Sequence, residues 1–297
     1  MKVRTAIGAA LLAAALYALN APLSKLLLAD VPPSMMAALL YLGAGVGMLL
    51  TGLIRHCLRR SPEPEAPSAA LFSRALLPYT LGMIVLDIAA PILLMTGIRL
   101  TSAESASLLN NFEIVATSLI ALLLFRERIS HRLWAAIGLI VLASTLLTIE
   151  SGAELSLSAG SIFVLLASSC WGRENNCTRR LSVADPLRVV VVKGLGSGSG
   201  ALLVAFLSGE SFPALGYIPA ALLLGYVAYG LSIFFYVYAQ RRLGAAKTSA
   251  FYAIAPFIGV ALSLTIFRDP PSFFFLSALA VMIAATVLVV KDQQGAQ

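Results

Sequence analysis

The sequence is short of charge. Only 12% of its 297 residues are Asp, Glu, Lys or Arg, 59% are hydrophobic, and the mean hydropathy is +0.91. Soluble domains carry about 25% charged residues. This composition therefore cannot cover a water-exposed surface, which excludes an ordinary soluble enzyme and a disordered protein. A helix that crosses the bilayer core needs about 20 apolar residues, so with short connections the chain has room for about ten.

Cysteine and histidine are also scarce. The three cysteines, Cys57, Cys170 and Cys177, are irregularly spaced and form neither a disulfide framework nor a metal site. The two histidines, His56 and His131, lie at predicted helix ends. The zinc-protease, phosphate-loop and nucleophile-elbow motifs do not occur. We therefore expect no cofactor, no metal, no enzymatic activity and no direct use of ATP.

Apolar segments bounded by charges, Pro or Gly predict an all-α membrane protein of ten transmembrane helices. A cleaved signal peptide is disfavoured because the first apolar run continues to Leu28. The predicted spans are residues 5–28, 33–54, 75–97, 102–124, 131–149, 159–180, 187–208, 217–240, 246–267 and 272–290.

Positive charge falls mainly on one side of these spans. Eighteen of the 21 Lys and Arg residues, Lys193 among them, lie on the face that holds the N-terminus. The other three are Lys25, Arg99 and Arg268. Since cytoplasmic loops carry the excess of Lys and Arg, both termini are expected in the cytoplasm. The net charge of +7 thus reflects topology, and no nucleic-acid partner is expected.

The chain also repeats itself. Leu124-Phe125-Arg126-Glu127 matches Ile266-Phe267-Arg268-Asp269 at an offset of 142, and the glycines at 43, 45 and 47 match those at 196, 198 and 200 at an offset of 153. Residues 1–150 and 151–297 are therefore predicted to be two five-helix repeats. Because five is odd, the repeats are inverted, as in many transporters. The glycines fit close helix packing.

These features resemble the drug/metabolite transporter superfamily, EamA type. Two five-span halves, Trp171-Gly172 and the Phe-Arg-Glu or Phe-Arg-Asp ends of spans four and nine carry the resemblance. Ala18 to Lys25 and Glu174-Asn175-Asn176 are similar to a subgroup near the YddG-like aromatic amino acid exporters. The resemblance implies a basket of ten helices that exports small metabolites, often amino acids, through a midplane cavity lined by spans 1, 3, 4, 6, 8 and 9.

Two acidic residues lie inside predicted spans, Asp87 in span three and Glu113 in span four. Ionisable groups within a bilayer are costly and usually face a cavity or a partner. Two interpretations stay open for each: a proton site or counter-charge for an ammonium group, and a hydrogen-bonded carboxyl that fixes helix packing.

Amides and rings accompany these acids. Asn110, Glu113 and Thr117 share one helical face, which is expected to point inward because bare amides are costly in hydrocarbon. Aromatic rings can stack on a flat or cationic substrate, or simply fill the core. The predicted substrate-binding residues are Tyr17, Asn20, Tyr79, Met83, Asp87, Asn110, Asn111, Glu113, Trp171, Glu174, Asn175 and Tyr229.

The sequence thus predicts an inner-membrane secondary transporter that exports amino acids, aromatic or neutral, by alternating access. Its expected partners are a small-molecule substrate, the lipid bilayer and, if transport is coupled, protons. An exchanger of nucleotide sugars or phosphorylated metabolites and a drug exporter of the same fold are the alternatives. A phosphate would require paired interior cations, and the interior offers at most Arg173 and Lys193 near one end, which disfavours anions.

Overall fold

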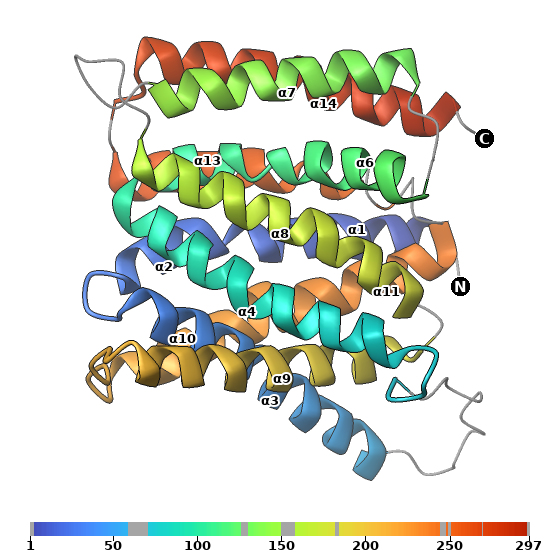
Figure 1. Ribbon diagram of the computed structural model, residues 1–297, viewed down its shortest axis with the longest axis vertical. Helices are drawn as coiled ribbons and strands as arrows, with labels where there is room; N and C mark the ends of the chain where they lie inside the picture. Colours follow the sequence, from blue (N-terminus) through green and yellow to red (C-terminus); the bar gives the residue numbers. More distant parts are fainter. Residues whose placement is uncertain are drawn as a thin grey trace.

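A computed structural model describes residues 3–58, 71–125, 130–149, 158–181, 184–243, 248, 251–268 and 270–295. Within these residues the chain is helical and contains no strand. The helices run roughly parallel to one another in stacked layers, and the first and last helices reach the same end of the bundle with their free ends (Figure 1). We call this the terminal end, and the other the distal end.

The first half of the chain holds α1 to α7. Their bounds are α1 Val3–Ala18, α2 Asn20–Leu27, α3 Pro33–Leu58, α4 Leu77–Leu100, α5 Ala103–Leu109, α6 Phe112–Phe125 and α7 His131–Ile149. The second half holds α8 Ala159–Leu181, α9 Pro186–Leu207, α10 Tyr217–Gly225, the π-helix η1 Tyr226–Leu231, α11 Ser232–Leu243, α13 Ala255–Phe267 and α14 Phe273–Gly295.

Five of the described helical stretches are long and apolar enough to cross a membrane. They are Arg4–Leu27, Pro33–Leu58, Leu77–Leu100, Pro186–Leu207 and Tyr217–Ala239. Shorter apolar helices occupy His131–Leu146, Ala255–Phe267 and Phe273–Leu288. The structure therefore confirms an all-α protein of the membrane type.

The exterior of the bundle is unusually apolar. Large apolar side chains such as Leu53, Val85, Leu203 and Leu223 point outward and are more than half exposed. A few charged and amide side chains, among them Asp87, Glu174 and Lys193, lie in the otherwise apolar interior of the bundle. An apolar exterior around hydrogen-bonded helices is what a bilayer requires.

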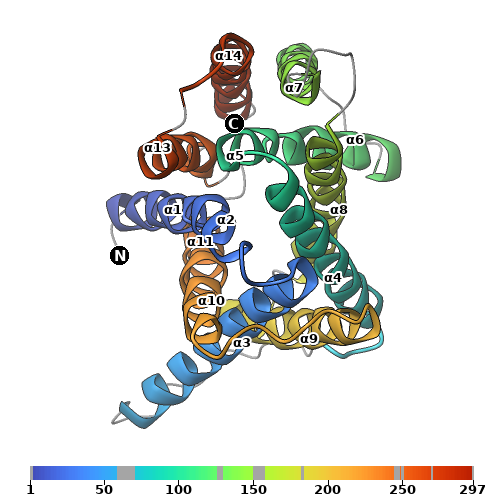
Figure 2. The ribbon, with the colours of Figure 1, turned by 90° about the vertical axis from the view of Figure 1, so that its left-hand side faces the viewer.

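The two halves interleave. α3 packs on α9, α4 on α8, α1 on α11, α5 on α13, and α7 on α14. Viewed from the distal end, most helices surround a centre, whereas α7 and α14 lie together outside this ring (Figure 2). Each half thus supplies helices on every side of the centre.

Glycines permit the closest of these contacts. At the crossing of α3 and α9, a Cβ added at Gly45 would lie 2.6 Å from the backbone nitrogen of Leu195, and one at Gly198 would lie 2.7 Å from that of Leu42. A Cβ does not approach a non-bonded backbone atom this closely in real proteins, so only glycine fits at these two positions. The prediction that these glycines serve helix packing is confirmed.

Candidate functional site

Three of the predicted spans are interrupted in the structure, and all three interruptions meet at one place. The first lies between α1 and α2, the second between α5 and α6, and the third just before α13. Breaks in membrane helices leave backbone groups unpaired, so they are tolerated where they line a cavity or are buried in protein.

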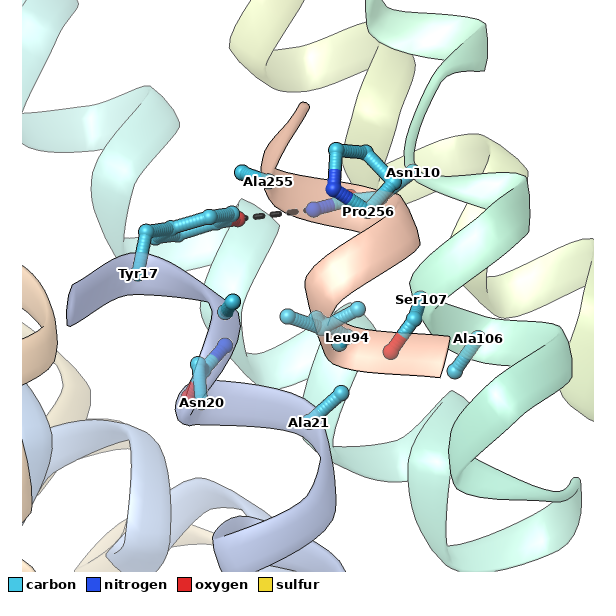
Figure 3. A pocket seen from close by; sticks show the side chains of 11 residues that line it. Tyr17, Asn20, Ala21, Leu94, Ala106, Ser107, Asn110, Ala255 and Pro256 are labelled. Atoms are coloured by element: carbon cyan, nitrogen blue, oxygen red, sulfur yellow. Dashed lines mark hydrogen bonds between the residues drawn. The ribbon is translucent and has the colours of Figure 1, made fainter. Parts of the chain in front are cut away.

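Pro22 explains the first interruption. Proline has no N–H and its ring clashes with the carbonyl four residues earlier, which here belongs to Ala18. α1 accordingly ends at Ala18, and Leu19 instead donates its N–H to the carbonyl of Leu16 at 3.3 Å. The break turns Tyr17 and Asn20 toward the interior of the bundle (Figure 3).

The second interruption falls at Asn110 and Asn111. Here the backbone switches to tighter hydrogen bonds, from Asn111 N to Leu108 O at 3.2 Å and from Glu113 N to Asn110 O at 3.1 Å. Asparagine side chains compete for backbone groups and so favour such turns. Glu113 is therefore placed in the first turn of α6.

The third interruption precedes Pro256. Ala253 and Ile254 form a turn, and Pro256 occupies the first turn of α13, where its missing N–H costs nothing. The tyrosine just before this turn, Tyr252, has its ring 5.8 Å from that of Tyr17.

A pocket lies between these interruptions (Figure 3). Its volume is about 20 Å³, which accommodates about one water molecule. In this conformation a metabolite therefore requires the surrounding helices to separate. The lining residues are Tyr17, Ala18, Asn20, Ala21, Leu94, Ala106, Ser107, Asn110, Ala255, Pro256 and Gly259.

Hydrogen bonds fix the polar side chains of this pocket. Asn110 Nδ2 donates to the Tyr17 hydroxyl at 2.7 Å, and Ser168 Oγ donates to Asn110 Oδ1 at 3.4 Å. Asn20 Nδ2 donates to the Tyr229 hydroxyl at 3.0 Å and Asn20 Oδ1 accepts from Ser24. The polar groups are thus preorganised by contacts between distant helices.

Tyrosine rings form a row beside the pocket. Tyr229 is 5.1 Å from Tyr41 and 6.0 Å from Tyr17, measured between ring centroids. Tyr252 continues the row to Tyr236, whose ring is 5.0 Å away. Tyr229 belongs to the π-helix η1, and such local widenings often occur at functional sites because they re-aim a side chain.

A buried ion cluster lies between α4, α8 and α9. Lys193 Nζ is 3.0 Å from Asp87 Oδ2 and 3.0 Å from Glu174 Oε1. Asp87 Oδ1 also accepts from the Tyr41 hydroxyl at 2.9 Å and from Trp171 Nε1 at 3.2 Å. Asp87 is 0% exposed and Glu174 is 2% exposed. We call Asp87, Glu174 and Lys193 the ion triad.

Glu113 lies apart from the triad and has neutral hydrogen-bond partners. Asn175 Nδ2 donates to Glu113 Oε1 at 2.6 Å and reaches Thr117 Oγ1 at 3.4 Å. Within the residues that the structure describes, no Lys, Arg or His pairs with this carboxylate. Glu113 keeps intermediate exposure, whereas the triad is sealed from solvent.

Similarity to known proteins now identifies the class. The model of the EamA-like transporter family matches residues 4–149 and again residues 158–291. An uncharacterized transporter of Methanothermobacter thermautotrophicus is 26% identical over 263 residues, which is 86% of this chain and 77% of that protein. The uncharacterized inner membrane transporter YedA of Escherichia coli K12 is 25% identical over 87% of this chain and 81% of its own.

The chain belongs to the EamA-like transporter family. A solved crystal structure has the same fold, with a TM-score of 0.69 at 18% identity over 99% of both chains. Family members and relatives are transporters rather than enzymes. This EamA protein is therefore a multi-pass membrane transporter, as the sequence predicts.

The predicted binding residues of this EamA protein divide into separate groups. Those that line the pocket or bond to a lining residue are Tyr17, Asn20, Asn110 and Tyr229. Glu113 of α6 and Asn175 of α8 form a hydrogen-bonded pair outside the pocket lining. Asp87, Trp171 and Glu174 form the second group, around Lys193. Asn111 is buried at the α5–α6 break.

Tyr79 and Met83 lie elsewhere. They belong to a separate apolar cluster near the terminal end, with Leu71 before α4, Leu181 of α8 and Val189 of α9. Arg180 also places its guanidinium carbon 5.9 Å from the centroid of the Tyr79 ring. Tyr79, Met83 and Asp87 share one face of α4. The first two belong to this apolar cluster and Asp87 belongs to the ion triad, so none of the three lines the pocket.

Sequence reasoning missed Lys193. The sequence places it near one end of span 187–208 and among the cations of the cytoplasmic face, but the structure buries it as the eighth residue of α9, where it is 7% exposed. The signal was present, because Lys193 follows four valines inside an apolar run. Its two partners are on other helices, so the sequence alone did not pair them.

Tyr41 and Tyr252 were also missed, for a different reason. Both lie in long apolar runs in which one tyrosine carries no pattern. Their contacts with Asp87 and Tyr17 arise only from tertiary packing. Of the repeated Phe-Arg-Glu and Phe-Arg-Asp signatures, residues 126, 127 and 269 lie outside the described part of the chain.

Proposed function

We propose that this protein is a secondary transporter that exports small metabolites, foremost amino acids with aromatic or neutral side chains, across an inner membrane. Substrate passes through a midplane site by alternating access of two inverted five-helix halves, residues 1–150 and 151–297. Both termini are proposed to be cytoplasmic. The direction of transport rests on the resemblance to exporters.

One observation carries this proposal: helices interrupted at corresponding positions of the two halves converge on one pocket. The breaks at Asn110 and at Ala253 are 143 residues apart, close to the offset of 142 that relates the repeats. Paired broken helices mark the substrate sites of transporters with inverted repeats.

The packing of the helices supports the repeat. α3 with α9, α5 with α13 and α7 with α14 each join counterparts of the two halves. α4 packs on α8 and α1 packs on α11, and a twofold axis that exchanges the halves carries one of these pairs into the other. The two separate matches to the family model agree with the same division.

The polar groups favour an amino acid over a phosphorylated substrate. Amides, hydroxyls and tyrosine rings line or adjoin the pocket, and they suit a zwitterion with a flat side chain. Among the described residues, the cation buried in the middle of the helices, Lys193, is held between two carboxylates. A phosphate would need free paired cations there.

Counterflow in proteoliposomes tests this function. Vesicles that contain the purified protein are preloaded with one unlabelled amino acid, and the uptake of labelled phenylalanine is followed. We expect preloaded phenylalanine, tyrosine, tryptophan or leucine to accelerate uptake and glucose 6-phosphate to have no effect. Acceleration by the phosphate ester, or by none of the amino acids in vesicles with verified protein, contradicts the substrate assignment.

A further inference from the structure

Asp87 and Glu113 both lie inside predicted spans, but the structure gives their carboxylates different partners. Asp87 has three partners: Lys193 forms an ion pair with its Oδ2, and Tyr41 and Trp171 donate hydrogen bonds to its Oδ1. Glu113 has amide and hydroxyl neighbours and no cation among the described side chains. The carboxylates of the triad already share an ammonium group, whereas a carboxylate without a cationic partner inside a membrane protein attracts a cation.

Two tyrosines lie near this carboxylate. The Tyr17 hydroxyl accepts a hydrogen bond from Asn110 at 2.7 Å, and the carbonyl of Asn110 accepts the N–H of Glu113 at 3.1 Å. The two rings lie 5.8 Å apart with an interplanar angle of 38°, and Tyr236 stands edge-on to Tyr252. Electron-rich ring faces around an acid are the groups that proteins use to hold ammonium ions.

The surrounding charge has the sign that such a site needs. The hydrogen bond from Asn175 holds Glu113 against α8, the helix that carries Glu174 of the ion triad, and the triad combines two carboxylates with one ammonium. With Glu113, the described groups in the middle of the bundle therefore comprise three carboxyls and one amine. An interior with excess carboxylates favours a cation and repels an anion.

The site is also connected to the pocket. Tyr17 lines the pocket and accepts the hydrogen bond of Asn110, another lining residue (Figure 3). A ligand whose ammonium group reached Glu113 would leave its apolar part toward Leu94, Pro256 and Gly259. Glu113 and the tyrosines keep intermediate exposure, so this side of the interior is not sealed as the triad is.

We infer that Glu113, with the rings of Tyr17 and Tyr252, forms the subsite for the ammonium group of the substrate, and that the ion triad does not bind it. This inference rests on the proposed function and deepens it. The ligand class is a primary amine that carries an apolar or aromatic body. The carboxylate of an amino acid is then not needed for binding at Glu113.

Direct binding tests the inference with three probes of similar shape. The purified full-length protein in lipid nanodiscs is titrated with phenethylamine, 3-phenylpropanol and 3-phenylpropionate by calorimetry. We expect phenethylamine to bind at least about tenfold more tightly than the alcohol, since a charged hydrogen bond is added. Glu113→Gln should weaken phenethylamine about tenfold or more and leave the alcohol unchanged.

Two further comparisons test whether a loss of phenethylamine binding comes from a general disturbance of the structure. Glu104→Gln is the matched control, because Glu104 stands in the first turn of α5 as Glu113 stands in that of α6. It should leave all three affinities unchanged. Tyr252→Leu should weaken phenethylamine about two- to fivefold, whereas Tyr252→Phe keeps the ring and should retain binding. This pair tests the subsite even if Glu113→Gln does not fold.

The outcomes separate the inference from the proposed function. Amine and alcohol that bind equally, an amine preference that survives Glu113→Gln, or equal losses in Tyr252→Leu and Tyr252→Phe would overturn the inference, even if amino acid counterflow succeeds. A Glu113-dependent preference for the amine supports it even if no amino acid exchanges. In that case the amino acid assignment alone fails, and the substrate is an amine.

Discussion

The buried ammonium of Lys193 holds three helices together only while its partners carry opposite charge. Asp87 lies on α4, Glu174 on α8 and Lys193 on α9, so the triad joins the two halves of the chain. Removing one member of a buried charge cluster leaves the others uncompensated, and this costs more than the intact cluster contributes. The triad is therefore expected to act as a structural unit.

Lys193→Met tests this expectation. The substitution keeps the length of the side chain but leaves two carboxylates together in the interior, and we expect a loss of about 3–5 kcal/mol in the free energy of unfolding. The loss is measured by SDS titration in mixed micelles. Lys291→Met is the control, since Lys291 is exposed on α14 and should change stability by less than about 0.5 kcal/mol.

A double variant distinguishes charge from packing. In Asp87→Asn/Lys193→Met the cluster again has one uncompensated carboxylate, as in the native protein, so part of the lost stability should return. Equal instability of the single and double variants would show that repulsion between the carboxylates of Asp87 and Glu174 does not cause the loss.

At the scale of the helix, α3 and α9 pack closely because the side chains at their crossing are the single hydrogen atoms of glycine. Gly45→Ala adds a Cβ within 2.6 Å of the backbone of Leu195, so the helices must separate. We expect a loss of about 1–3 kcal/mol in the free energy of unfolding, the usual cost of overpacking. Gly8→Ala in α1 meets nothing within 4 Å and should stabilise the protein by up to about 1 kcal/mol.

The opposite signs of these two changes are the test. Both replace a helical glycine by alanine, so helix propensity alone predicts a gain at either position. A gain at Gly45 measured by the same SDS titration would contradict the close approach of α3 and α9.

The interruption between α1 and α2 leads to a prediction about transport. In Pro22→Ala the N–H at position 22 becomes available to the Ala18 carbonyl, and α1 can continue into α2. Tyr17 and Asn20 then turn away from the pocket. We expect counterflow to fall at least about tenfold while stability stays equal or rises, because misplaced binding groups reduce rate without unfolding the chain.

Pro91→Ala provides the comparison for this variant. α4 runs through Pro91 without interruption, so its replacement should change counterflow less. If Pro91→Ala impairs counterflow as much as Pro22→Ala, the break at Leu19 has no special role in the site.

The sequence predicted the helical segments well and their interruptions poorly, for a physical reason. Segments follow from about 20 successive apolar residues, which any window along the chain detects. Asn110 and Asn111 were recognised as polar residues of a continuous span, whereas the structure ends α5 there and begins α6 at Phe112. Whether asparagines end a helix depends on partners such as Tyr17, 93 residues away.

For the molecule as a whole, the charge bias is the main argument for orientation. Burial removes Lys193 from the predicted count, which still assigns the other 17 Lys and Arg residues to the face that holds the N-terminus. The bias acts through Lys and Arg in short loops, so the loss of one residue leaves the predicted orientation unchanged. The prediction therefore still places the C-terminal end of α3 in the cytoplasm.

Native Cys57 offers a direct measurement of this orientation. It lies exposed near the C-terminal end of α3, whereas Cys170 and Cys177 are partly buried in α8. In a Cys170→Ser/Cys177→Ser background, a membrane-impermeant maleimide should label Cys57 in spheroplasts only after permeabilisation. Ser211→Cys, in the exposed connection between α9 and α10 at the distal end, should be labelled in intact spheroplasts when Cys57 is also replaced by Ser. Labelling of Cys57 before permeabilisation together with protection of position 211 would place the termini outside, and would reverse the direction in which the pocket must open to release substrate.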